Sequence, residues 1–455
     1  MNKSLFAEIV EKYFKIVIGK ITEKFNGSKK ESPLLHKTML TEEYSADLTY
    51  GATELNNSVV AADVVAMDSP LPLKSRGSIK NASGKLPKLG VKYRKGEKDI
   101  SDINIMRSRG TDEATIASKV MEDTPKCVKS MDVRKEIMFE QALSTGMTLV
   151  SGDETEEEND GTGVRVSFGY LDENTFHATV APWGQSGYKP VDDIEQMFAK
   201  AMEDGNAINH VYLSKKYFNF IRSSEQGKKL VADFRGQIYT NIAHLTQPGR
   251  QAMLDALADE FGATFHIVDS SFKVEEHSGK KHSVRPWEEA NLVGVPEEVV
   301  GRLVYGTLAE ETNPVPGVSY QKSGSHVLIS KYSKTDPLEE FTAAQALCLP
   351  VIDGGDSIYL LHADETDNFT VSKDEMTFTS AKGSDTATIH YDGVLGDLTI
   401  TADEDFVTVS RRKNVLTVSV SANTGVGATE RTATVSITDG TETLTIGVTQ
   451  AAPAS

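Results

Sequence analysis

The stretch KSMDVRKEIMFEQALSTGMTLV, residues 129–150, places a long helix directly before a strand. Met131, Met138 and Ala142 recur at helical spacing and share one face. Gly146 is expected to end the helix, because glycine readily takes the left-handed conformation found at helix C-termini. The letters MTLV then continue as a strand. The sequence therefore predicts an α+β fold built around this helix.

Upstream of this stretch the sequence predicts a second helical segment. Thr111 is a candidate N-cap, with Asp112 and Glu113 in the first turn. Pro125 should interrupt or kink the helix, because proline lacks the amide proton that a helix interior needs.

Residues 26–109 differ from the rest, since they are rich in lysine and turn residues and show little periodicity. A segment of this length without a core-forming pattern is unusual in a compact domain. It is either disordered or an extended arm that becomes ordered on a neighbouring molecule.

The first 25 residues predict an amphipathic helix. Charges at Glu8, Glu11, Lys12 and Lys15 interrupt any apolar run, so this is not a secretory signal. The helix is expected to place its apolar face on a partner helix or a neighbouring subunit. That face consists of Phe6, Val10, Tyr13, Val17, Ile21 and Phe25. No other segment approaches the roughly 20 apolar residues of a membrane span, so no membrane partner is expected.

Downstream the pattern changes twice. The acidic run DETEEEND at 153–160 lacks the ligand spacing of a calcium loop and is interpreted as a solvated hairpin tip. From Pro190 helices alternate with strands, which predicts a sheet covered by helices. The segment EEFTAAQALCLPV at 339–351 is interpreted as a helix or turn, and DSIYLLHAD at 356–364 as a strand.

Residues 369–450 consist almost entirely of short alternating strands, such as VLTVSVS, TATVSITDG and TLTIGVTQ. Threonine and valine at period two, broken by Asp-Gly and Asn-Thr-Gly turns, are typical of half-buried antiparallel strands. Several such strands at regular spacing predict a small all-β sandwich appended to the larger part.

Composition argues against several classes of function. The net charge of −18 argues against a protein body that coats nucleic acid. Cys127 and Cys348 give neither a disulfide framework nor a metal-ligand spacing. His277 and His282 lie in a basic turn without a third ligand. We find no catalytic constellation, so neither an enzyme nor a cofactor is expected.

The order of these parts resembles the major capsid proteins of tailed bacteriophages, in the branch of the HK97-type shell fold that includes the lambda major capsid protein. The resemblance covers residues 1–365. The stretches that carry it are SRGSIKNASGKLPKLGVKYRKGE at 75–97, VRKEIMFEQALSTGMTLV at 133–150, VRVSFGY at 164–170, KPVDDIEQMFAKAMEDG at 189–205 and KYSKTDPLEEFTAAQALCLPVIDGGDSIYLLHAD at 331–364.

The resemblance implies an N-terminal arm with its amphipathic helix at 1–70 and an extended loop at 71–109. It further implies a peripheral domain with a spine helix, and an axial domain. The peripheral domain takes residues 110–189 and 316–365, and the axial domain takes residues 190–315. Some members of the fold crosslink through a lysine, for which Lys85 or Lys95 are the candidates, but the lambda-like branch does not generally do so.

The implied function is self-assembly into hexamers and pentamers of an icosahedral head in the virion, formed in the host cytoplasm. Partners would be further copies, a scaffold, a portal, cement proteins and packaged DNA bound without sequence specificity. The residues expected between subunits are Phe6, Val10, Tyr13, Val17, Lys74, Arg76, Lys85 and Lys88.

Residues 369–451 resemble the BACON family of immunoglobulin-like domains, on Asn423-Thr-Gly, Glu430-Arg431 and the closing Gln450. That family often lies beside carbohydrate-active domains, which implies a glycan or mucin as partner. The candidate contacts are Phe378, His390, Tyr391 and Phe406. The domain is either an exposed, adhesive decoration that projects outward or a structural cap that reinforces the shell.

Two other classes of function remain as alternatives. In a carbohydrate-active enzyme the sandwich would serve as a glycan-binding accessory, but only two tryptophans, Trp183 and Trp287, are available to line a cleft. A tail-fibre adhesin would show fibrous repeats, which the sequence lacks.

Overall fold

The computed structural model describes residues 2–27, 34–51, 83–150, 164–237, 245–275, 279–366, 370–371, 373, 375–390, 398–412, 415–424, 429–438 and 443–453. The chain forms two compact units. The first comprises Met1–Leu171 and Met197–Leu360, and the second comprises Asp172–Gln196 and Leu361–Ser455. No helix among the described residues is long and apolar enough to cross a membrane.

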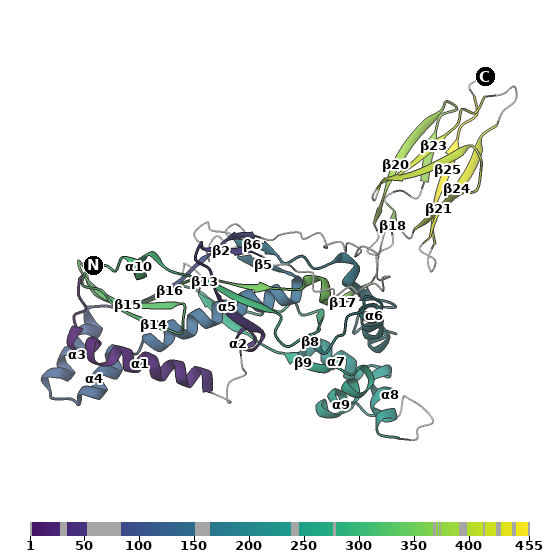
Figure 1. Ribbon diagram of the computed structural model, residues 1–455. Coiled ribbons are helices and arrows are strands. Elements are labelled where there is room, and N and C mark those ends of the chain that lie inside the picture. Colours follow the sequence, from purple (N-terminus) through teal and green to yellow (C-terminus); the bar gives the residue numbers. More distant parts are fainter. Residues whose placement is uncertain are drawn as a thin grey trace, which may run out of the picture. The chain divides into compact units, whose positions relative to one another are not determined.

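A long sheet forms the centre of the first unit (Figure 1). Its middle strand is β16, Leu338–Ile352. Leu347 of β16 pairs with both Lys88 of β4 and Gly306 of β13, so β4 and β13 flank β16 on opposite sides. The strands around β16 are β1 Leu40–Tyr44, β4 Lys88–Lys95, β13 Gly301–Gly306, β14 Ser319–Ser323 and β15 Val327–Thr335.

The predicted central helix is α5, Thr124–Thr145, and it packs along this sheet (Figure 1). The side chains of Cys127, Phe139 and Leu143 on α5 are fully buried, and buried residues occur on more than one face of this helix. Gly146 ends the helix at φ 69°, as predicted. The short ribbon β5 Met147–Val150 and β6 Val164–Ser167 follows.

Helices cover one end of the sheet. These are α1 Ala7–Gly27, α3 Glu97–Ser108 and α4 Glu113–Val120, with the one-turn α10 Ala309–Thr312 farther along the chain. Pro125 lies in the first turn of α5, so the predicted interruption between two helices is confirmed. The N-cap of α4 is Asp112 and not the predicted Thr111, because the Asp112 carboxylate accepts the Thr115 amide at 3.0 Å.

Two sequence interpretations are wrong. EEFTAAQALCLPV is neither helix nor turn but the centre of β16, since strand partners on both sides override its helix-forming alanines and glutamates. The region 26–109 was expected to be disordered or to become ordered on a neighbouring molecule, but where it is described it is ordered within the chain, since β4 pairs with β16. It contains α2 Leu35–Met39, β1, β2 Thr49–Gly51, β3 Ser83–Lys85, β4 and α3.

The predicted α/β alternation is confirmed between residues 210 and 295. Strand β8, His210–Ser214, pairs in parallel with β9, Thr264–Val268, and antiparallel with β12, Asn291–Val295. The helices are α7 Lys215–Ser223, α8 Glu225–Phe234 and α9 Arg250–Phe261. A hairpin of β10 Phe272–Glu275 and β11 Lys281–Val284 lies between β9 and β12 in sequence, and the turn η3 Gly355–Ser357 follows β16.

The second unit contains the predicted sandwich. One sheet has the order β18-β20-β23-β22 and the other β19-β25-β24-β21. Their inward side chains form a core of their own, with Leu416, Val435 and Ile446 fully buried. The strands are β18 Thr370–Val371, β19 Glu375–Phe378, β20 Gly383–His390, β21 Thr399–Ala402, β22 Val407–Arg412, β23 Val415–Val420, β24 Arg431–Thr438 and β25 Thr443–Gln450.

The remaining elements of this unit precede the sandwich in sequence or lead into it. They are η1 Asp172–Asn174, β7 Thr175–Ala178, α6 Pro190–Glu203 and β17 Tyr359–Thr366, of which the last two continue into the first unit. The Asp193 carboxylate of α6 is fully buried and accepts Trp183 Nε1 at 2.7 Å and the Thr179 amide at 2.9 Å.

Candidate functional site

The apolar face of α1 packs within the same chain. Phe6 is 3% exposed and Val10 is not exposed at all, so neither presents surface to another copy here. Tyr13 and Val17 are half-buried against the same core. The structure therefore uses this face for the intramolecular core, and a role between subunits stays a prediction.

The first residues of the chain are bound to the hairpin of β15 and β16. The Asn2 amide donates to the Ser333 carbonyl at 3.0 Å, and the Ser333 amide returns the bond at 3.0 Å. Buried Glu340 accepts the Ser4 hydroxyl and, at 3.1 Å, the Leu5 amide. Burial raises the pKa of Glu340, although these two bonds oppose the rise. The arm is therefore anchored by a carboxylate near the beginning of α1.

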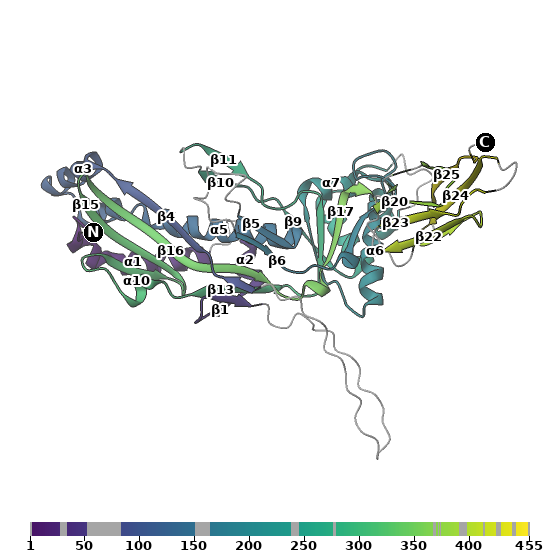
Figure 2. The ribbon, with the colours of Figure 1, turned by 90° about the horizontal axis from the view of Figure 1, so that it is seen from above.

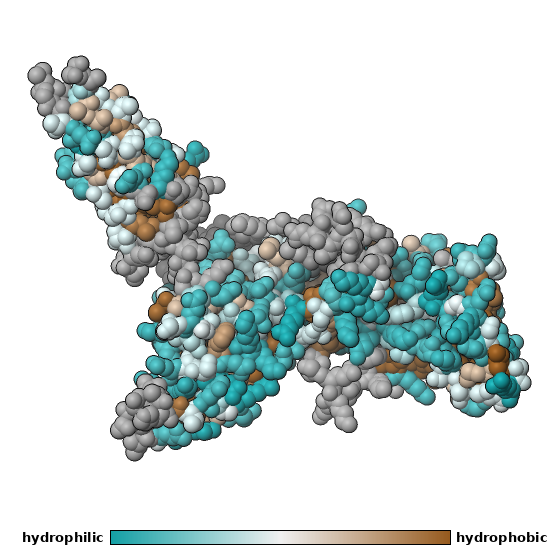
Figure 3. Space-filling view, turned by 180° about the vertical axis from the view of Figure 1, so that it is seen from behind, coloured by the Kyte–Doolittle hydropathy of each residue, from teal (hydrophilic) through white to brown (hydrophobic). Residues whose placement is uncertain are grey.

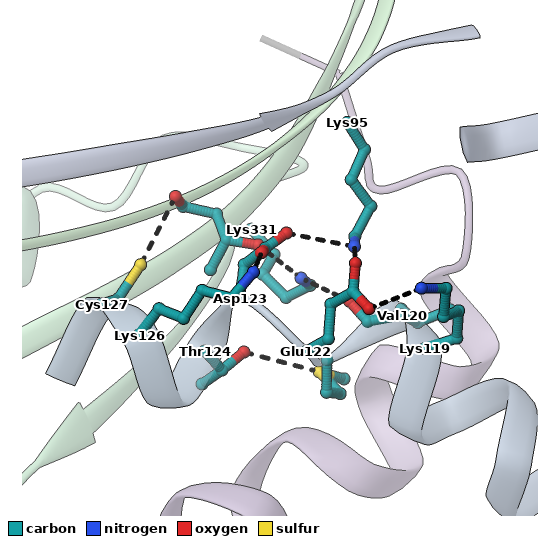
Figure 4. Close-up of polar contacts among 11 residues, drawn as sticks. Lys95, Lys119, Val120, Glu122, Asp123, Thr124, Lys126, Cys127 and Lys331 are labelled. Carbon is teal, nitrogen blue, oxygen red and sulfur yellow. Dashed lines mark hydrogen bonds and ion pairs between the residues drawn. The ribbon is translucent and has the colours of Figure 1, made fainter. Parts of the chain in front are cut away.

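A partly buried ion cluster ties β4 to the corner between α4 and α5 (Figure 4). Lys95 Nζ lies 2.7 Å from Glu122 and 3.1 Å from Asp123, although Lys95 is only 4% exposed. Lys119 binds Glu122 and Lys126 binds Asp123, each at 2.8 Å. Burial alone would raise the pKa of Asp123, but Lys126 and Lys95 together hold it below its usual value. This cluster fixes the end of β4.

Lys331 lies in the same region and is completely buried (Figure 4). Its ammonium donates to Thr342 Oγ1 at 2.6 Å and to the Val120 carbonyl at 3.2 Å, and burial lowers its pKa to about 8. Cys127 and Cys348 are both buried free thiols, and burial raises the pKa of each to about 12. Thiols so protonated are poor nucleophiles.

A second buried cluster joins α2 to the middle of α5. Glu136 accepts His36 Nδ1 at 2.5 Å and the amides of Leu35 and His36 at 2.5 and 3.0 Å. One turn later Glu140 contacts Glu136 and accepts the hydroxyl of Ser270, which follows β9. Burial, reinforced by the charge of Glu136, raises the pKa of Glu140 to about 8, so this carboxyl is protonated at neutral pH.

The base of the expected extended loop is also held in place. Strands β2 and β3 pair there, and the Tyr50 ring covers Gly84, where a Cβ would lie 2.7 Å from the tyrosine hydroxyl oxygen. Arg302 binds Asp353 at 2.7 Å and also contacts Glu43. Of the loop residues expected between subunits, Lys85 and Lys88 are exposed, whereas Lys74 and Arg76 lie outside the described residues.

The aromatic residues expected to contact glycan do not form a platform where they are described. Phe406 is half-buried, and the Arg431 guanidinium covers its ring at 4.1 Å from the centroid. Phe378 packs against the sandwich core on the other sheet. Tyr391 and the side chain of His390 lie outside the described residues.

The residues that carry the BACON resemblance have a structural explanation. The buried Gln450 side chain donates to the carbonyls of Ala381 and Ser421 and accepts Arg431 Nε at 2.9 Å. Asn423 Nδ2 donates to the carbonyls of Thr429 and Ala451. These side chains join the ends of several strands.

The described residues contain no group of three or more histidines, cysteines or carboxylates placed to hold a metal ion. His277 lies outside them. A hollow of about 440 Å³ beside α3 and α4 contains a single carboxylate. It is lined by Met106, Ala114, Thr115, Ser118, Lys119 and Glu122.

Sequence reasoning missed Glu136, Glu140, Glu340 and Lys331. Sequence periodicity cannot separate a buried charge from an exposed one when the facing partner comes from a distant segment. The one available signal was α5 itself, whose apolar residues are spread around the helix and so leave no wide polar face.

The family model for "Phage major capsid protein E" matches residues 19–351. Among solved structures, an E. coli CFT073 prophage protein assigned as a capsid protein is 13% identical, covers 76% of this chain and 98% of its own, and has a TM-score of 0.44. A phage-related protein of Bordetella bronchiseptica RB50 is 13% identical, with 76% and 96% coverage and a TM-score of 0.43. The capsid of Myoviridae phage XM1 is 10% identical, with 73% and 93% coverage and a TM-score of 0.37. No curated protein matches the chain.

Proposed function

The chain belongs to the phage major capsid protein E family, and from that premise we propose that its copies assemble into hexamers and pentamers that close an icosahedral head around DNA. The predicted capsid family, the structural capsid role and the location in the virion are confirmed by the family match. The α+β architecture agrees with the HK97-type fold predicted from the sequence. The ring sizes, the closed shell and the enclosed DNA belong to the proposal.

The observation that carries the proposal is a rigid plate of sheet and helix to which the arm and the loop base are firmly attached. Helix α5 packs along β16, and the ion pairs of Lys95 hold β4 to the N-terminal end of α5. Glu340 holds the start of α1 to the same strand. A plate whose appendages are fixed at their bases suits heterologous contacts, which close into rings when the rotation between copies allows it.

The sandwich is proposed to lie on the outside of the shell. It has its own core, and its strands carry outward threonine and serine side chains, such as Thr432, Thr434 and Ser436 on β24. Thr432 is exposed, whereas Thr434 and Ser436 are half-buried, and these outward hydroxyls suit contact with water or with a polar partner. A surface glycan or mucin stays a prediction, and the coverage of Phe406 by Arg431 argues that aromatic stacking would not be its basis.

The other partners are proposals of the same kind: a scaffold, a portal, cement proteins and DNA held without sequence specificity. We also propose that the chain has no enzymatic activity. The described clusters of charged residues are internally paired and serve packing. The alternative, a carbohydrate-active enzyme, would need a pair of carboxylates facing an open cleft.

Light scattering of the purified chain across protein and salt concentration, followed by negative-stain imaging of the heaviest fraction, tests the proposal. Rings of five or six copies, tubes or closed shells are expected. A chain that stays monomeric even with a co-expressed scaffold would contradict the proposal. Hydrolysis of a panel of polysaccharides by that monomer would favour the enzyme.

A further inference from the structure

Within the part of the chain that the structure describes, the main sheet has two edge strands on opposite sides, and their outer edges are here called its rims. Among the described strands β4 pairs only with β16, and β1 pairs only with β13. Because Leu347 pairs with β4 on one side and β13 on the other, the order across this part of the sheet is β4-β16-β13-β1. Figure 2 shows β4 and β1 on opposite margins of the sheet. The outer edge strand β14, by contrast, packs against α1.

The two rims carry opposite charge. On β4 the side chains of Lys88 and Lys92 are exposed, and that of Arg94 is 67% exposed. On β1 the side chains of Glu42 and Glu43 are 52% and 46% exposed. The basic rim is notable because the whole chain carries a net charge of −18.

An open strand edge with unpaired amides and carbonyls invites pairing with another strand. Two copies cannot join β4 to β4 or β1 to β1 without bringing like charges together, which opposes association. Joining β4 of one copy to β1 of the next brings opposite charges together. The charge pattern therefore disfavours symmetric pairs and favours a head-to-tail arrangement.

We propose that the basic rim of β4 docks on the acidic rim of β1 of a second copy of this chain, so that neighbouring copies join head to tail through their main sheets. This rests on the proposed assembly function and identifies the contact that would carry it. Head-to-tail contacts use two different surfaces, as closed rings require.

The match of both rims favours a second copy over DNA as the occupant of the basic rim. DNA would leave the acidic rim of β1 without a partner, whereas a second copy matches both rims. The visible face of the first unit in Figure 3 is mostly hydrophilic, with apolar residues in small separate spots. That face therefore offers no large apolar patch as an alternative contact between copies.

A charge-swap series tests the proposal in the full chain. The variant Lys88→Glu/Lys92→Glu gives the β4 rim a negative net charge, and Glu42→Lys removes the net charge of the β1 rim. Arg94 and Glu43 are left unchanged because they pair with Glu339 and Arg302, whereas Glu42 accepts the Ser325 hydroxyl and lies 3.7 Å from His326 Nδ1. In the combined triple variant the two rims no longer carry like net charge. The matched control is Lys15→Glu/Lys98→Glu at exposed positions on α1 and α3. It changes the net charge of the chain by the same amount as Lys88→Glu/Lys92→Glu.

We expect Lys88→Glu/Lys92→Glu to lower the yield of rings or shells at least about tenfold at low salt, since like charges across an interface suppress association. Glu42→Lys should lower the yield less, because it removes attraction without adding repulsion, and the triple variant should assemble better than Lys88→Glu/Lys92→Glu. The control should stay within about twofold of the wild type, because its rims are unchanged. Lys88→Glu/Lys92→Glu and the control should retain the wild-type melting temperature, whereas Glu42→Lys also loses its bond to Ser325. Carbodiimide treatment of mixed ¹⁴N- and ¹⁵N-labelled copies should give isotopically mixed crosslinks from Lys88 or Lys92 to Glu42 or Glu43.

The proposal is overturned if the wild type assembles and Lys88→Glu/Lys92→Glu assembles equally well. It is also overturned if that variant forms normal shells that lose only their DNA, because the rim would then face nucleic acid. If the wild type forms no rings or shells, the proposed function fails instead. Crosslinking of the concentrated chain then decides the rim contact separately.

Discussion

Replacing Glu140 by glutamine should make the stability of the folded chain less sensitive to alkali. Glu140 is 1% exposed, contacts Glu136 and accepts the Ser270 hydroxyl. Glutamine has the same shape, cannot ionise, and can donate to Glu136 while it accepts from Ser270. The variant therefore keeps the contacts of the protonated acid at every pH.

The sign and size follow from the pKa of Glu140 in the two states. Folding raises it from an ordinary 4.5 to about 8, so folding favours the protonated form. The stabilisation is complete below pH 4.5, falls as pH rises towards 8 and is lost above 8. At about 1.4 kcal/mol for each pH unit, that difference corresponds to about 5 kcal/mol, as an order of magnitude. The advantage of Glu140→Gln over the wild type should thus grow from near zero at pH 4.5 to several kcal/mol above pH 8.

Urea unfolding of unassembled chain at pH 5, 7 and 8.5 measures this advantage. Glu195→Gln, an exposed carboxylate on α6, is the matched control and should give no difference that changes with pH. The reasoning is refuted if the advantage of Glu140→Gln is the same at pH 5 and pH 8.5. It is equally refuted if the wild type becomes the more stable of the two as the pH rises.

Three further predictions concern packing. Gly146→Ala should lower the free energy of unfolding by about 1–3 kcal/mol more than Gly110→Ala. Both glycines have positive φ, but only at Gly146 would a Cβ meet another side chain, 2.8 Å from the Tyr170 ring. Equal losses of stability in urea unfolding would contradict this. Gln450→Leu should lower the stability of the sandwich by about 3 kcal/mol, since it leaves buried polar groups unpaired. An unchanged unfolding transition in calorimetry would contradict this. The thiol of Cys348, whose pKa burial raises to about 12, should not react with a thiol reagent at pH 8 until the chain unfolds, and rapid labelling of the native chain would contradict its burial.

The sequence predicted those elements whose local signals agree with their tertiary surroundings. Gly146 ends α5 as expected, because the αL conformation it adopts is a local preference of glycine. The strands of the sandwich were predicted because alternation and turns are also local signals. The family could be identified from the order of such parts, although each part alone is loosely specified.

The failures have a common physical cause, which is long-range pairing. Residues 339–351 contain helix-forming alanines, yet they are held in β16 by β4 and β13, which are distant in sequence, and by the adjacent hairpin strand β15. Periodicity shows that the face of Phe6 and Val10 is apolar but not whether its partner belongs to the same chain, so their expected role between subunits stays a prediction. Sequence spacing likewise gave no indication that Lys95 and Asp123 form a buried pair, since β4 and α5 meet only in the folded chain.

The most direct test of the central claim is an electron cryo-microscopy reconstruction of the particles formed by the purified chain, alone or with its scaffold. We expect closed shells with fivefold and sixfold rings. The density of each copy should accommodate α5 and the main sheet, and neighbouring copies should meet through the rims of β4 and β1. Particles without rotational rings, or shells whose density cannot hold the plate of α5 and β16, would contradict it.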